Sequence, residues 1–217
     1  VDEKENRIYL GPGRTDKVLV YDLKGNYLPD EVIRFGEIVH KSQIWVDYDK
    51  KNVVVVTLPF SANVNSNFAI SKNVCWVQNR EGDIVHRIPV NHYGLIGDYS
   101  NALVARRNVD AISFSISEVP MLRTRPDTLY HYDAVKNIIT PCFTIDHVVS
   151  ENQSACTVLY ETSRSYWAQV TLYPNNLSSS VSSVRLPAFN VCVSKKDGNV
   201  RRIDRFTDPL LGLSHLF

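Results

Sequence analysis

The sequence predicts an all-β protein in which one antiparallel unit recurs four times. Val-rich runs and a high aromatic content, with 11 Tyr, 8 Phe and 3 Trp, favour strands. The chain has one methionine, Met121, and no stretch of a dozen residues follows a helical apolar period. Short strand patterns that run into a tight turn and out again begin at Val18, Val74, Thr128 and Val191.

The four turns share residue types that tolerate positive backbone φ. Their equivalent positions are separated by 57, 55 and 61 residues and are occupied by Gly25, Gly82, Asn137 and Gly198. A tight hairpin needs positive φ, which a Cβ penalises, so glycine is the natural residue there. Asp22 and Asn79 precede their glycines by three residues. We expect their side chains to accept hydrogen bonds from backbone amides within the turn.

In the first half of the chain, strands are expected at 7–10 and over 17–28, broken at the turn of Gly25 and linked by Gly11-Pro12-Gly13. Two inner strands follow at 43–48 and 52–58. Residues 61–67, Ser-Ala-Asn-Val-Asn-Ser-Asn, read as a polar loop.

In the second half, residues 111–116 alternate in polarity. This alternation places Ile112, Phe114 and Ile116 on one face of a strand and the serines on the other. The last unit has strand patterns at 155–160 and 166–173, a Ser-rich loop at 178–183 and a closing hairpin.

A unit of this size predicts a β-propeller, because one four-stranded sheet cannot bury both faces alone and must stack against copies of itself. Propellers close with about four to eight blades, and the first unit here begins inside a strand pattern. We therefore expect a single propeller domain. It should be an incomplete six-bladed ring, with about four blades in this chain. The approximate blades are 1–35, 36–90, 91–145 and 146–217.

The charge balance excludes some partners. Lys and Arg number 24 against 23 Asp and Glu, which leaves a net charge of +1 and no strong field to attract nucleic acid. No apolar run has the length of a membrane span, and residues 1–6 are charged rather than signal-like. We expect no nucleic-acid partner, and membrane contact only through a lipid anchor absent from this chain.

The cysteines are widely spaced in apolar stretches, without a Cys-x-x-Cys pair, at Cys75, Cys142, Cys156 and Cys192. Such residues behave as small hydrophobes, so we expect buried free thiols, with one or two disulfides as the alternative. The histidines are also scattered, without metal-ligand spacing, at His40, His86, His92, His131, His147 and His215. His131 lies between two tyrosines of an alternating strand, and we expect it to be half-buried and hydrogen-bonded rather than a base.

Other motifs indicate no specific chemistry. Asp47-x-Asp49 lacks the glycine and glutamate of a calcium loop, so a charged hairpin tip is expected. No Gly-x-Ser-x-Gly elbow or phosphate-binding glycine pattern occurs. Basic residues form either a rim for anionic groups such as glycan carboxylates or solvated strand edges; they are Arg106, Arg107, Arg123, Arg125, Arg201, Arg202 and Arg205. Tyr166, Trp167 and Tyr173 either stack on sugars or belong to the core.

Several segments carry a family resemblance. They are KVLVYDLKGNY at 17–27, IWVD at 44–47 with LPF at 58–60, DTLYHY at 127–132 with TPCF at 140–143, and VRRIDRF at 200–206. Together they resemble the six-bladed β-propeller lipoproteins of Bacteroidetes, which are similar to NHL-type propellers. The resemblance implies a periplasmic or cell-surface location. It also implies a lipoprotein leader and further blades that this sequence lacks, and it supplies no catalytic residues.

We therefore expect a non-enzymatic binding or scaffold module of the bacterial cell envelope, with a protein or carbohydrate ligand. The alternative is a propeller hydrolase or lyase with a metal site at the central channel, since propellers can build such a site from one residue per blade. A third possibility is a structural remnant whose edge strand pairs with another molecule. The sequence assigns no catalytic residue, metal ligand, cofactor or oligomeric state.

Overall fold

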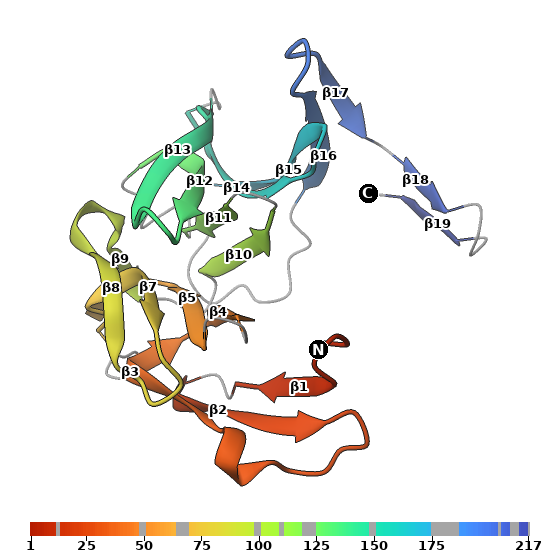
Figure 1. Ribbon diagram of the computed structural model, residues 1–217. Helices are drawn as coiled ribbons and strands as arrows, with labels where there is room; N and C mark the ends of the chain where they lie inside the picture. Colours follow the sequence, from red (N-terminus) through yellow and green to blue (C-terminus); the bar gives the residue numbers. More distant parts are fainter. Residues whose placement is uncertain are drawn as a thin grey trace. The chain divides into compact units, whose positions relative to one another are not determined.

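The protein is all-β, as predicted (Figure 1). The computed structural model describes residues 1–11, 14–47, 51–63, 70–97, 101–108, 111–118, 125–147, 151–174, 187–203, 205–208 and 213–216. Within these ranges the helical elements are two short 3-10 turns, η1 (Pro29–Glu31) and η2 (Asn91–Tyr93). No helix among the described residues has the length and apolarity needed to cross a membrane.

The chain divides into two compact units. The first comprises Val1–Tyr99 together with Tyr132–Ile139, and the second comprises Ser100–His131 together with Thr140–Phe217. Each unit contains antiparallel sheets whose strands mostly follow one another in sequence. Consecutive strands pair readily because short turns are enough to connect antiparallel neighbours.

The first unit contains a three-stranded and a four-stranded antiparallel sheet and a short parallel pair. The three-stranded sheet is β1 (Arg7–Leu10), β2 (Arg14–Asp22) and β3 (Ile33–His40). The four-stranded sheet has the order β4 (Ser42–Asp47), β5 (Asn52–Thr57), β7 (Asn73–Gln78) and β8 (Ile84–Pro89). The parallel pair is β6 (Phe60–Asn63) and β9 (Leu95–Gly97).

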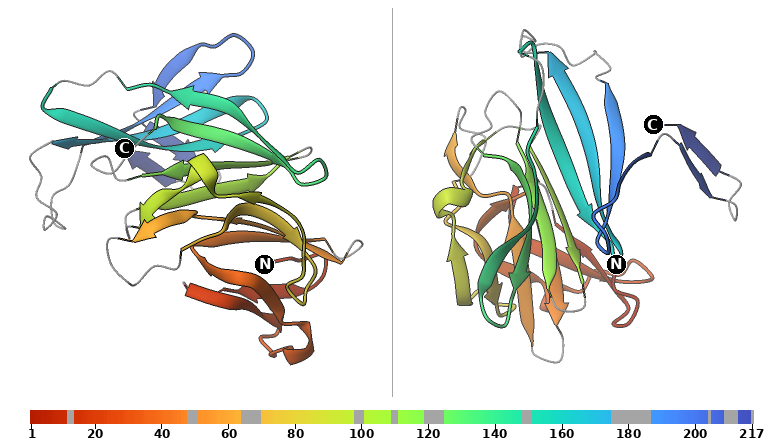
Figure 2. Two further views of the ribbon diagram at one scale, coloured as in Figure 1. Left: turned by 90° about the vertical axis from the view of Figure 1, so that its left-hand side faces the viewer. Right: turned by 90° about the horizontal axis from the view of Figure 1, so that it is seen from above.

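Two four-stranded sheets follow along the chain. The earlier has the order β10 (Ala102–Arg107), β11 (Ile112–Ser117), β12 (Asp127–Asp133) and β13 (Ile138–Ile145). The later has the order β14 (Gln153–Glu161), β15 (Ser165–Pro174), β16 (Ala188–Ser194) and β17 (Val200–Ile203), and its long strands β14 and β15 run side by side in cyan in Figure 2. A final hairpin is β18 (Arg205–Asp208) with β19 (Leu213–Leu216).

The predicted turn chemistry is confirmed. Backbone φ is +87° at Gly25, +101° at Gly82, +55° at Asn137 and +71° at Gly198. Asp22 Oδ1 accepts the amides of Lys24 and Asn26 at 2.9 and 2.8 Å. Asn79 Oδ1 likewise accepts the amide of Asp83 at 2.8 Å. These turns are therefore specified by a local steric rule and by side chains that cap the turn amides.

Several expected boundaries need correction. The first expected boundary, between 35 and 36, falls inside β3. The boundary after 90 lies just beyond β8, and the one after 145 lies at the last residue of β13. Residues 61–63 were expected in a loop but belong to β6, which pairs in parallel with β9 through Ala62 and Ile96. The remainder of that loop and the Ser-rich loop at 178–183 lie outside the described residues.

The core of the first unit joins its two larger sheets. Eight buried residues form it, and Trp76 from β7 is the largest of them. They are Val18, Val20, Ile33, Phe35, Val39, Val53, Val55 and Trp76. Gln78 is fully buried beside them, and its Oε1 accepts the indole N–H of Trp76 at 2.7 Å.

The serines of β11 are buried, although their alternation is also that of a strand with one solvated face. Ser115 Oγ accepts the amide of Leu159 at 3.2 Å, and Ser117 Oγ lies 2.7 Å from Cys156 Sγ. Both partners belong to β14, so the serine face of β11 packs against the next sheet. Small hydroxyl side chains suit this contact because each finds a hydrogen-bond partner.

Candidate functional site

A buried glutamate, Glu161, is the centre of a polar cluster in the second unit. Its side chain is 4% exposed. Oε2 lies 2.7 Å from His131 Nε2 and accepts a hydrogen bond from Asn108 Nδ2 at 2.9 Å. Oε1 accepts a hydrogen bond from Lys195 Nζ at 2.5 Å. A buried carboxylate is stable only when its oxygens are paired in this way.

The cluster is assembled from strand ends. Glu161 is the last residue of β14, Asn108 directly follows β10, and Lys195 directly follows β16. The backbone amide of Lys195 donates to the carbonyl of Arg164 at 3.0 Å, which links the turn after β16 to the turn after β14. The position of Asn108 is fixed by its backbone amide, which donates a hydrogen bond to the carbonyl oxygen of Ala111 at 2.8 Å.

The local electrostatics keep Glu161 ionised. Burial pushes its pKa upward, but the hydrogen bonds from Lys195 and His131 outweigh burial, and the pKa lies below the ordinary glutamate value. An ionised carboxylate only accepts hydrogen bonds, so Nε2 of His131 carries the proton in the bond to Glu161.

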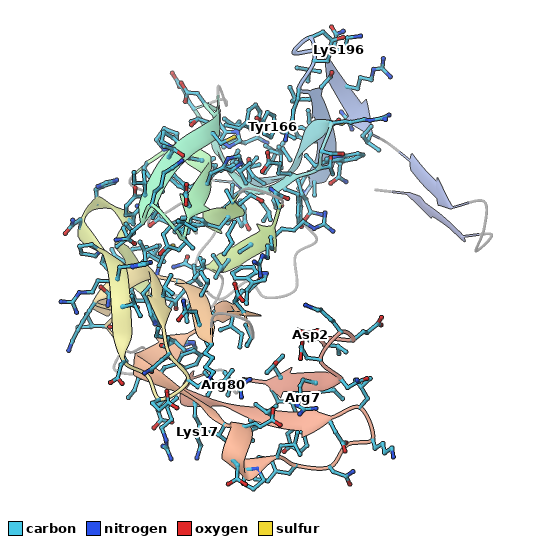
Figure 3. The ribbon with its side chains drawn as sticks, viewed as in Figure 1. Asp2, Arg7, Lys17, Arg80, Tyr166 and Lys196 are labelled. Carbon is cyan, nitrogen blue, oxygen red and sulfur yellow. The ribbon has the colours of Figure 1, made fainter. Side chains whose placement is uncertain are left out.

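Aromatic and thiol groups lie beside the cluster. The ring of Tyr166 stacks on Phe143, with centroids 4.6 Å apart and planes 9° apart, and Lys195 Nζ lies 4.9 Å from the Tyr166 centroid. Tyr166, labelled in Figure 3, also places its hydroxyl 3.3 Å from Cys142 Sγ. This hydrogen bond with Cys142, together with burial, raises the pKa of Tyr166 to about 12, so the phenol is neutral at pH 7.

A cleft of about 830 Å³ opens beside Glu161. Arg107, which is exposed, contributes a guanidinium group to its lining. Among the described residues of the lining, Glu161 is the one acidic residue, and its charge is already paired. The lining residues are Arg107, Asn108, Ala111, His131, Glu161, Thr162, Ser163 and Lys195. The cleft therefore presents an excess of cationic and hydrogen-bond-donating groups.

A second hollow, of about 430 Å³, shares Glu161 and Thr162 with the cleft and is more apolar. Its lining includes the half-buried Trp167 and the exposed Arg106, together with Val104, Ala105, Ser113, Leu129, Leu159, Tyr160, Ala168 and Asn190. A charged cleft and an aromatic crevice thus adjoin each other at the end of β14.

One group of possible metal ligands occurs among the described residues. Ligand atoms of His131, Cys142 and Glu161 all lie within 4.8 Å of one another. Imidazole, thiolate and carboxylate are all ligands of zinc in proteins. The arrangement could therefore hold a metal ion without a change of fold.

The expectation for His131 is confirmed, since its side chain is 32% exposed and bonded to Glu161. The other described histidines lie elsewhere. His40 packs edge-on against Phe60, His86 Nε2 lies 2.8 Å from Ala134 O, and His92 contacts Tyr93. His147 is buried with Asp127 and Thr157. The side chain of His215 and the whole of Asp49 lie outside the described residues.

The arginines considered as a basic rim or as solvated strand edges lie in different places. Arg107 lines the cleft and Arg106 the crevice, whereas Arg125 lies 3.9 Å from the carboxylate of Glu118. Arg201 and Arg202 are exposed on β17, where Arg202 lies over the ring of Phe189. Arg123 and the side chain of Arg205 are outside the described residues.

The predictions for the three aromatic residues and for the cysteines also have mixed outcomes. Tyr166 and Trp167 lie at the two hollows, and Tyr173 is partly buried. All four cysteines are free, with Cys75 and Cys156 buried and Cys142 and Cys192 only half-buried. The prediction of buried thiols is therefore correct for two of the four.

The main residues of the cluster were missed at the sequence level. Glu161, Asn108 and Lys195 were not singled out, because each is a common polar residue next to a strand. The available signal was positional, since each one stands at the end of a strand pattern from a different part of the chain. That signal needs the pairing of the sheets before it can be interpreted.

A separate ion cluster in the first unit places two arginines beside one carboxylate. Arg7 donates to both carboxylate oxygens of Glu31, at 2.7 and 2.6 Å, and Arg80 lies 3.9 Å from the same carboxylate. Arg7 and Arg80 are labelled in Figure 3. The hydrogen bond from Arg7 is the main reason why the pKa of Glu31 is lowered. This cluster is best explained as a structural link between η1 and its neighbours.

Comparisons with known proteins add no family assignment. No protein-family model matches the chain, and neither a curated protein nor a solved structure matches it significantly.

Proposed function

We propose that the second unit is a non-enzymatic binding module for an acidic carbohydrate. The observation that carries this proposal is the cleft beside Glu161, in which Arg107 and Lys195 supply positive charge and the carboxylate of Glu161 is already paired. An anionic group entering this cleft meets complementary charge, whereas a cationic ligand is repelled.

The carboxylate of a uronic acid fits the donors of the cleft. Arg107 offers a planar guanidinium that pairs with a carboxylate in a bidentate manner. Lys195 donates one of its three hydrogens to Glu161 and retains two for a ligand. Thr162 and Ser163 add hydroxyl groups to the lining, which suits the hydroxyls of a sugar ring.

The adjoining crevice suits the apolar face of a sugar. It is lined by Trp167 with Val104 and Leu129, and it shares Glu161 and Thr162 with the cleft. Aromatic rings offer flat apolar surface with polar edges, which matches one face of a pyranose. An oligosaccharide could occupy the charged cleft and the crevice together.

A binding role agrees better with the site than acid–base catalysis does. Glycoside hydrolases usually employ two carboxyl groups, one of them with a raised pKa. In the cleft, Glu161 is the single acidic residue among the described lining residues, and its pKa is lowered. A carboxylate held ionised by Lys195 and His131 is a poor general acid.

Isothermal titration calorimetry with galacturonic acid oligomers tests this proposal, with neutral galactose oligomers as the ligand control. We expect binding of the acidic oligomers that weakens with added salt, since the attraction is screened. Arg107→Ala and Lys195→Gln should each weaken binding at least about tenfold, the size expected for a lost charged hydrogen bond. Arg201→Ala removes an exposed arginine outside the cleft and should leave affinity unchanged. Equal binding of acidic and neutral oligomers would contradict the proposal.

We further propose that the four larger sheets are blades of a β-propeller domain, about four of the six in a ring of the bacterial cell envelope. The support is the family resemblance, the order of the sheets along the chain and the recurrent positive-φ turns. Electron cryomicroscopy or crystallography of the protein encoded by the complete gene tests the ring. A stack of sheets without a shared axis would exclude it. Fractionation of the source cells tests the periplasmic or surface location.

A further inference from the structure

We propose that His131, Cys142 and Glu161 form a zinc-binding site. Their ligand atoms lie within 4.8 Å of one another. In a tetrahedral zinc site such atoms stand about 3.3 to 3.6 Å apart, given zinc–ligand distances of about 2.0 to 2.3 Å. To reach a common metal, His131 Nε2 and Glu161 Oε2, now 2.7 Å apart, would separate by about 0.6 Å, and Cys142 Sγ would approach them by up to about 1 Å. Both shifts are within the reach of side-chain rotation.

The ligand types select the metal. Calcium and magnesium take oxygen ligands, so a thiolate and an imidazole exclude them as the natural occupants. Cysteine, histidine and glutamate together fit zinc, which accepts sulfur, nitrogen and oxygen in one tetrahedron. Three protein ligands leave a fourth position for water or for a group of a bound molecule.

The surrounding hydrogen bonds allow the metal to enter. In the structure His131 Nε2 and Glu161 Oε2 are 2.7 Å apart and share a proton, and zinc would take the place of that proton. Lys195 bonds the other oxygen, Oε1, and can remain there while Oε2 binds the metal. The electrostatic repulsion between the Lys195 ammonium group and the metal ion is reduced, because each binds a different oxygen of Glu161.

The proton balance is simple when the imidazole starts neutral. Nε2 of His131, Sγ of Cys142 and Oε2 of Glu161 each donate an electron pair to Zn²⁺. The imidazole proton moves from Nε2 to Nδ1, and the thiol proton of Cys142 leaves to solvent. The two positive charges of Zn²⁺ then balance the negative charges of the Cys142 thiolate and the Glu161 carboxylate.

Tyr166 would serve as an outer-shell partner. Its hydroxyl lies 3.3 Å from Cys142 Sγ, and a neutral phenol can donate to a metal-bound thiolate. Such outer-shell partners typically change metal affinity by about 10- to 100-fold. We therefore expect Tyr166→Phe to weaken zinc binding without abolishing it.

Cobalt(II) substitution tests the site, with no carbohydrate present, so that failure here is separate from failure of the proposed binding function. The wild-type protein should show a near-ultraviolet thiolate-to-cobalt charge-transfer band that zinc bleaches by competition. Cys142→Ser should lose this band, whereas Cys192→Ser, which removes another half-buried thiol, should retain it. His131→Gln should weaken binding by at least about tenfold, as expected for a lost ligand.

A second measurement needs no variant. Zinc should protect Cys142 of the wild-type protein from alkylation, while Cys192 stays equally reactive, as read by peptide mass spectrometry. Circular dichroism would verify that the variants keep their strand content. The proposal is overturned if the wild-type protein gives no charge-transfer band, if the band survives Cys142→Ser, or if zinc leaves Cys142 unprotected.

Discussion

Gly36 of β3 faces Gly82 in the turn between β7 and β8 at backbone contact distance. A Cβ on Gly36 would stand 2.7 Å from the carbonyl oxygen of Gly82 and 2.9 Å from Cγ1 of Ile84. A Cβ on Gly82 would stand 3.2 Å from the carbonyl carbon of Phe35, at a residue whose φ is already +101°. The two sheets of the first unit can therefore approach here only because both residues lack a side chain.

Gly36→Ala should destabilise the protein by about 1 to 3 kcal/mol, because the added methyl group overlaps backbone that cannot easily move. Urea unfolding followed by tryptophan fluorescence measures the change. Gly11→Ala is the matched control, since a Cβ there meets nothing within 4 Å. Equal stability of the two variants would show that the contact between Gly36 and Gly82 is not tight in solution.

Gln78→Leu should destabilise the protein by at least about 2 kcal/mol, because it leaves several buried groups without partners. Gln78 accepts from Trp76 Nε1 and donates to the carbonyls of Arg34 and Asn79. Thermal unfolding measures the loss. Gln43→Leu on β4 provides the comparison, since Gln43 is only half-buried, and it should change stability by no more than about 0.5 kcal/mol.

Glu161→Gln should reduce stability at neutral pH, and the deficit should shrink in acid. The folded pKa of Glu161 lies below its ordinary value of 4.5, so its ionised form stabilises the folded state above that pH. This contribution is lost as pH falls from 4.5 through the folded pKa. Urea midpoints of wild type and variant, compared between pH 7 and pH 3, measure the effect. A constant difference across this range would argue against an ionised Glu161.

Asp127→Ala should destabilise the second unit by about 2 to 4 kcal/mol, because it breaks a buried network. Asp127 Oδ2 accepts the amide of Thr157 at 2.8 Å and lies 3.0 Å from His147 Nε2. Hydrogen exchange at the Thr157 amide should rise in the variant. Asp133→Ala at the other end of β12 should destabilise the protein far less than Asp127→Ala, since that carboxylate caps an exposed turn.

The candidate site illustrates how far sequence reasoning reaches. His131 was correctly expected to be half-buried and hydrogen-bonded, because its place between two tyrosines of a strand is a local property. Its partner Glu161 lies 30 residues away on another sheet. No spacing rule connects them, because the distance between them depends on how the two sheets pack.

The buried serines of β11 show a second limit. Alternating serine and apolar residues are typical of a strand with one wet face, yet Ser115 and Ser117 bond to groups of β14. A hydroxyl group is equally compatible with water and with a buried backbone partner. Only the neighbouring sheet decides between the two.

The amino-acid sequence by itself determined the all-β class and the positive-φ turns at Gly25, Gly82, Asn137 and Gly198, since strand propensity and turn sterics act over a few neighbouring residues. The tertiary structure alone decided that Glu161, His131 and Lys195 meet at one cleft and that Gly36 faces Gly82. Such contacts join residues far apart in the chain, and they depend on the packing of whole sheets rather than on any local preference.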